Sequence, residues 1–145
     1  MQNLSVTDFI PIIQLPSVRN GALVQARESG GKTTLLVTLH SASCAGCREY
    51  LDSLAPLAGE LDAWDGRLLV IVPGALSEAA LVSAPVGNVL ADEHCRIADP
   101  ASASVIVADR YGHVFDAIHT GASHKLPSPR ELEEWLKYLG TLCPE

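Results

Sequence analysis

Two cysteines three residues apart, Cys44 and Cys47, follow an apolar stretch and a short Ser/Ala turn. The stretch 34–39 is apolar and β-branched, which predicts a strand buried on both faces. A helix is expected to begin near Arg48. A thiol at a helix N-terminus meets unpaired backbone N–H groups and the positive end of the helix dipole, and both favour thiolate over thiol. Because this spacing also allows a small disulfide, the pair predicts redox chemistry.

A metal site is the other chemistry that a cysteine pair can support. A structural zinc ion needs four ligands, and His94, Cys95 and Cys143 do not show the spacing of a zinc ribbon or knuckle. We therefore expect no metal ion and no other cofactor. Cys95 and Cys143 have two interpretations, either ordinary cysteines or accessory resolving thiols.

His40 ends the predicted strand, just before the cysteine turn. An imidazolium there would favour the thiolate, and a neutral imidazole could hold a proton during exchange. The alternative is a core histidine with no chemical role. His94, His113 and His119 are expected at the surface or at sheet edges.

Composition limits the possible partners. The chain has 145 residues, 48% of them hydrophobic, which is enough for a single domain over residues 1–145 with a sizeable core. Ten basic and seventeen acidic residues give a net charge of −7, and the basic residues are not clustered. We expect no nucleic-acid partner. No apolar run has the length of a membrane span, and residues 1–4 do not resemble a signal peptide, so we expect a cytoplasmic protein without membrane contact.

The elements that must position the cysteines are predicted from periodicity. Asn20-Gly21 predicts a tight hairpin that pairs 17–19 with 22–24. Residues 48–64 carry leucines at helical spacing, with a kink expected at Pro56. A strand is expected at 68–72, a short helix at 77–83 capped by Ser77, and a strand at 86–90.

The C-terminal half adds three clear elements. Strands are expected at 104–108 and 113–118, paired antiparallel, and a short helix is expected to begin near Cys95. Ser128, Pro129 and Glu131 form a capping box for a last helix that ends at Gly140. This order predicts an α/β fold with a mostly parallel, finally mixed sheet and helices on both faces.

From Ser17 to Leu139 the chain resembles the thioredoxin superfamily, in particular its redoxin or peroxiredoxin-like (AhpC/TSA-type) branch. The motif Cys44-Ala45-Gly46-Cys47-Arg48 carries most of the resemblance, and residues 105–112 and Gly121 add to it. The resemblance implies a three-layer α/β/α sandwich with a mixed sheet and an N-terminal hairpin extension. It also implies that Cys44 is the nucleophile and Cys47 the resolving thiol, with His124 in a loop near them.

The chain departs from both branches. Thioredoxins have tryptophan, proline and a buried aspartate where this chain has Ser43, Gly46 and Thr38, and their cis-proline falls near Ala103. Of the peroxiredoxin motif Pro-x-x-x-Thr/Ser-x-x-Cys, only Ser41 and Cys44 are present. The activating arginine of that branch has no match in register, which leaves three candidates: Arg48, Arg96 and Arg110.

Three functions stay open. The first is a thiol–disulfide oxidoreductase for cell redox homeostasis, with a disulfide-bearing protein as substrate and an external dithiol as reductant. The second is an antioxidant thiol peroxidase that reduces a small peroxide through Cys44. The third is a non-catalytic thioredoxin-like binding or metal-carrying module.

Overall fold

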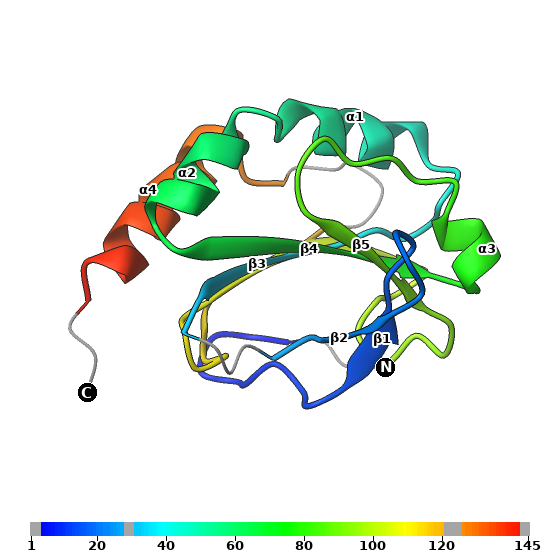
Figure 1. Cartoon of the computed structure of the whole chain (residues 1–145), viewed down its shortest axis with the longest axis horizontal. Coiled ribbons are helices and arrows are strands. Elements are labelled where there is room, and N and C mark those ends of the chain that lie inside the picture. The colour runs from blue at the N-terminus through cyan, green and yellow to red at the C-terminus, as the bar shows by residue number, and fades with distance from the viewer. Residues whose placement is uncertain (1–3, 28–30, 121–125, 143–145) are drawn as a thin grey trace.

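The computed structural model describes residues 4–27, 31–120 and 126–142. At its centre lies a five-stranded mixed sheet with the order β5-β4-β3-β6-β7 (Figure 1). β3 is parallel to β4, and β4 to β5, whereas β6 and β7 add antiparallel pairings. The strands are β3 (Thr33–Thr38), β4 (Gly66–Pro73), β5 (Asn88–Asp92), β6 (Ala103–Ala108) and β7 (Val114–Thr120).

β3 is the central strand, and all six of its residues are buried. This explains its continuous apolar and β-branched sequence, because both of its faces contact other layers. Thr38, its last residue, pairs with Ile71 of β4 and with Ser104 of β6. The chain therefore leaves β3 between the end of β4 and the beginning of β6, and this is where the cysteine turn begins.

Three helices cover one face of the sheet: α1 (Ala45–Ser53), α2 (Leu57–Ala63) and α4 (Pro129–Gly140) (Figure 1). Their leucines pack against the alternate strand residues that include Leu35 and Val37. The predicted break at Pro56 is confirmed, since Pro56 is the N-cap of α2. The capping box of Ser128 and Glu131 is confirmed as well.

The other face is covered by the N-terminal segment and by a hairpin of β1 (Gln14–Pro16) and β2 (Leu23–Gln25). Sequence predicted helices on both faces, but within the described residues no helix lies on this side. Instead of a helix, β1 and stretches of irregular chain bury apolar side chains against the sheet. Those side chains are Leu15 of β1 and, from irregular chain, Leu4, Ile10, Ile13, Ile97 and Ala98. The mixed sheet and the N-terminal hairpin extension are as predicted.

The hairpin register differs from the expected one. Gln14–Pro16 pairs with Leu23–Gln25, and residues 17–22 form a longer connection in which Gly21 has φ +74°. Ser17 and Val18 turn instead to β5, because the Ser17 hydroxyl donates to the Asn88 side chain and the Val18 N–H to Val89. The connection thus covers the free edge of β5.

Three further predictions need correction. The short helix is α3 (Leu76–Ala79), capped at Ala75, so Ser77 lies inside it and does not cap it. The strand expected at 86–90 begins at Asn88, because Gly87 sits in a turn with φ +89°. No helix begins near Cys95. There the buried Asp92 carboxylate accepts three backbone N–H bonds, from residues 96, 97 and 98, and holds the chain in a turn.

Among the described residues, no helix is both long enough and apolar enough to cross a lipid bilayer.

Candidate active site

Cys44 and Cys47 lie at the first turn of α1, as the sequence predicted. The helix begins three residues earlier than expected, at Ala45, because Cys44 itself is the N-cap and accepts a hydrogen bond from the Cys47 N–H at 3.3 Å. Both cysteines are thiols and neither is in a disulfide. The Cys44 side chain is half-buried, whereas Cys47 is only 1% exposed. One thiol is therefore open to a reactant and the other is shielded behind it.

The environment of Cys47 keeps its thiol protonated. Burial, followed by the hydrogen bond with the Cys44 side chain, raises the pKa of Cys47 to about 11. A backbone interaction at His40 acts in the opposite direction but is weaker. Since a thiol must lose its proton to act as a nucleophile, Cys47 needs a base before it can attack.

His40 lies where such a base is required. Its Nδ1 is 3.7 Å from Cys47 Sγ, within hydrogen-bonding range for sulfur. The imidazole is half-buried and follows β3 after the buried Leu39, so the strand and the cysteine turn together fix its position. A ring nitrogen of His40, Cys44 Sγ and Cys47 Sγ all lie within 4.8 Å of one another. The sequence had left the role of His40 open between chemistry and packing, and the structure brings it into contact with the dithiol.

The turn that precedes Cys44 is held by its own polar groups. The Ser41 hydroxyl accepts the Ser43 N–H at 3.1 Å and bonds the Ser43 hydroxyl at 2.9 Å. Arg48 donates two hydrogen bonds from its guanidinium to the Ala42 carbonyl, at 3.2 and 2.9 Å. Ser41 and Arg48, both candidate supporting residues, therefore brace the backbone of the turn.

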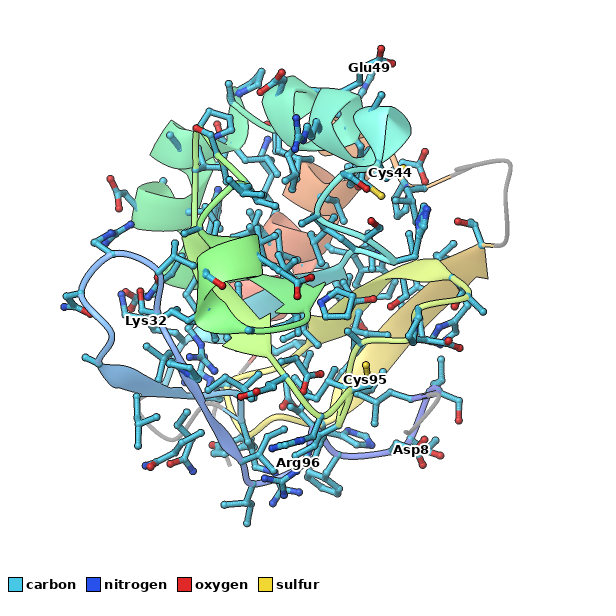
Figure 2. All side chains as sticks on the ribbon, turned by 90° about the vertical axis from the view of Figure 1, so that its right-hand side faces the viewer. Asp8, Lys32, Cys44, Glu49, Cys95 and Arg96 are labelled. Atoms are coloured by element: carbon cyan, nitrogen blue, oxygen red, sulfur yellow. The ribbon has the colours of Figure 1, made fainter. Side chains whose placement is uncertain are left out.

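The other two candidate arginines lie elsewhere. Arg110 follows β6, whose last residue pairs with Thr34 at the beginning of β3, opposite the end that carries the cysteines. Figure 2 shows Arg96 beyond Cys95 and well away from Cys44. Neither supplies the activating arginine of a peroxiredoxin.

The structure shows what surrounds two positions at which the sequence departs from thioredoxins. Thr38 stands where thioredoxins have a buried aspartate. Its hydroxyl forms a hydrogen bond with the hydroxyl of Ser104 across β3 and β6, and both residues are buried. Ala103, at the expected cis-proline position, begins β6 and is fully buried in the same core cluster as Cys47. No peptide bond in the described ranges is cis.

A hollow of about 410 Å³ opens beside the cysteine turn. The sequence did not predict it because its walls come from three separate segments, which only the fold brings together. Cys95 lies on its wall, in a left-handed backbone conformation with φ +49°, and Figure 2 shows it on the same side of the molecule as Cys44. The hollow is lined by His40, Ser41, Ala42, Ser43, Pro73, Gly74, Glu78, Leu81, Glu93, Cys95 and Pro100.

The hollow is partly apolar and partly acidic. Leu81, on the wall of the hollow, is 69% exposed. Two acidic side chains, Glu78 and Glu93, also line the hollow. Burial and the nearby Asp92 raise the pKa of Cys95, which favours its neutral thiol. The candidate residues Gly121, His124 and Cys143 lie outside the described residues, and so does any contact they make.

Comparison with solved structures identifies the fold. AhpC from Enterococcus faecalis superposes with a TM-score of 0.78 at 11% identity, over 96% of this chain and 98% of that one. AhpC from Mycobacterium tuberculosis superposes with a TM-score of 0.74 at 14% identity, over 98% of this chain and 97% of that one. The fold is thioredoxin-like. A protein from Chlorobium tepidum described as thiol:disulfide interchange protein DsbE superposes with a TM-score of 0.70 at 17% identity, over 94% of this chain and 99% of that one.

These thioredoxin-like neighbours confirm the predicted fold class and its likeness to redoxins and peroxiredoxins. No protein-family model and no curated protein sequence matches the chain.

Proposed function

We propose that this protein is a thiol–disulfide oxidoreductase in which Cys44 attacks a substrate disulfide and Cys47 resolves the product. The observation that carries the proposal is the pairing of a half-buried Cys44 at the N-cap of α1 with a buried, protonated Cys47 whose thiol faces His40. This arrangement separates the roles of the two sulfurs before any substrate arrives.

In the first step the Cys44 thiolate attacks one sulfur of the substrate disulfide. The substrate S–S bond breaks, a Cys44–substrate mixed disulfide forms, and the other substrate sulfur leaves as a thiolate that takes a proton from water. The helix N-terminus supports negative charge on Cys44 through the Cys47 N–H.

In the second step the Cys47 thiol passes its proton to Nδ1 of His40 and attacks Cys44 Sγ. The mixed disulfide breaks, the second substrate thiolate leaves, and a Cys44–Cys47 disulfide remains. An external dithiol then reduces this disulfide by the same exchange chemistry. His40 thus does the work that a buried carboxylate does in thioredoxins.

A polypeptide disulfide is the proposed substrate class. The hollow beside the turn is rimmed by the exposed Leu81, an apolar side chain that a polypeptide can contact. Arg96 and Arg110 lie away from Cys44, which disfavours a peroxidase.

Two rates measured side by side test the proposal. We expect the reduced protein to turn over a protein disulfide with dithiothreitol as reductant, and to lose this turnover in Cys44→Ser. Stopped-flow oxidation by hydrogen peroxide should stay near the slow rate of an ordinary thiol. Fast oxidation by peroxide without disulfide turnover would instead identify a peroxidase. Failure of both reactions would favour a non-catalytic module.

A further inference from the structure

The geometry points to a thiophilic metal site at the same turn: His40 Nδ1, Cys44 Sγ and Cys47 Sγ together bind one d¹⁰ cation, Zn²⁺ or Cu⁺. His40 follows β3 after Leu39, the cysteines lie at the first turn of α1, and one ligand atom from each of the three residues lies within 4.8 Å of the others. This proposal goes beyond the oxidoreductase function and does not depend on it.

The spacing of the three atoms suits a small cation. With metal–sulfur bonds of about 2.3 Å and metal–nitrogen bonds of about 2.0–2.1 Å, ligand atoms around a tetrahedral ion lie roughly 3.4–3.8 Å apart. Cys47 Sγ and His40 Nδ1 are 3.7 Å apart, already at this separation. The remaining pairs, within the 4.8 Å limit, need side-chain shifts of at most about 1.4 Å.

The ligand set selects the type of cation. Two thiolates and one imidazole favour soft or borderline ions and disfavour Mg²⁺ and Ca²⁺, which take oxygen ligands. Two thiolates neutralise Zn²⁺ or leave a single negative charge with Cu⁺. The Cys47 N–H donates to Cys44 Sγ and would orient that ligand.

A cation that binds the sulfur of Cys47 takes the place of the thiol proton, so metal binding should release protons. The half-buried Cys44 and His40 leave a route for the ion to enter.

Metal binding and dithiol chemistry use the same two sulfur atoms. The Cys44–Cys47 disulfide has no thiolate to offer, so only the reduced protein should bind the ion. A bound ion would in turn protect the dithiol from exchange. The two states of the protein are therefore mutually exclusive.

The test is anaerobic competition titration of the fully reduced protein, in one arm with Zn²⁺ and in the other with Cu⁺, each against a chromogenic chelator. We expect one ion per chain with at least one of the two metals. His40→Ala should weaken that binding at least tenfold, and prior oxidation to the disulfide should abolish it. X-ray absorption should count two sulfur ligands and one nitrogen ligand.

Matched controls are His94→Ala, an exposed histidine, and Cys95→Ser, a thiol on the wall of the hollow. Both should leave the metal affinity unchanged. The proposal is overturned if neither metal binds, if His40→Ala binds as tightly as the parent, or if Cys95→Ser removes the site. Circular dichroism confirms that each variant is folded. Disulfide turnover is measured separately, so failure of the metal site leaves the oxidoreductase proposal standing.

Discussion

His40 Nδ1 lies 3.7 Å from the thiol of Cys47, a cysteine that is 1% exposed and whose pKa is raised to about 11. The strand that ends before His40 and the helix that begins after Cys44 fix this contact from two sides. In the proposed mechanism, this contact supplies a proton acceptor for the buried thiol. The position of the thioredoxin carboxylate is held here by Thr38, whose hydroxyl pairs with that of Ser104.

His40→Ala should slow resolution of the mixed disulfide by roughly 100-fold at pH 7, a typical contribution for a positioned base. Without the imidazole, attack depends on the small thiolate fraction of Cys47, so the variant's rate should rise about tenfold per pH unit between pH 7 and 9. Quenched-flow mass spectrometry follows the mixed disulfide. His94→Ala should behave like the parent, and a flat pH profile in His40→Ala would exclude the role.

Stability should depend on pH through Cys47. The folded-state pKa of about 11 lies above the ordinary value of 9.0, so the native state keeps this proton when the unfolded chain has lost it. The stabilisation is complete below pH 9 and is lost as pH rises towards 11, by on the order of 2 kcal/mol. Urea unfolding of the parent and of Cys47→Ala at pH 8 and 10.5 measures this pH-dependent contribution to the free energy of unfolding. An unchanged difference between the two proteins would contradict the assignment.

Asp92→Asn should destabilise the protein by about 2–4 kcal/mol, because the buried carboxylate accepts the N–H groups of residues 96, 97 and 98. The same change should increase amide exchange over residues 93–98, which carry Cys95 into the hollow. Asp62→Asn, at an exposed carboxylate, is the control and should change stability by less than about 0.5 kcal/mol. Equal effects of the two substitutions would show that these hydrogen bonds add nothing.

Leu81→Glu tests the hollow as a binding site for polypeptide disulfides. An additional negative charge and the loss of apolar contact should raise KM for a protein disulfide about tenfold and leave reduction of a small neutral disulfide unchanged. Leu23→Glu, at a leucine that is 62% exposed on β2, should change neither. If Leu81→Glu slows both substrates equally, the residue acts on the turn and not on docking.

Local sequence predicted the placement of the candidate site residues better than it predicted the surrounding structure. Cys44, Cys47 and His40 are separated by at most seven residues, so the strand and helix around them largely determine their geometry. The helix break at Pro56 and the capping box at Ser128 were also predicted correctly, because each depends on residues close together in the sequence.

The errors arose where tertiary contacts override local preference. Asn20-Gly21 does make a turn, but pairing of Ser17 and Val18 with β5 lengthens the connection and shifts the hairpin. Asp92 turns the chain before a helix can form at Cys95. The hollow depends on segments 40–43, 73–81 and 93–100 meeting at one end of the sheet, which no single stretch of sequence encodes.

The central claim is that Cys44 attacks and Cys47 resolves. Cys47→Ser, incubated with a disulfide-containing peptide and quenched with acid, should accumulate one mixed disulfide per chain, and peptide mass spectrometry should place it on Cys44. Cys44→Ser should accumulate none at the same time point, because Cys47 is buried and protonated. A mixed disulfide on Cys47 in Cys44→Ser, or on Cys95 in Cys47→Ser, would contradict the account.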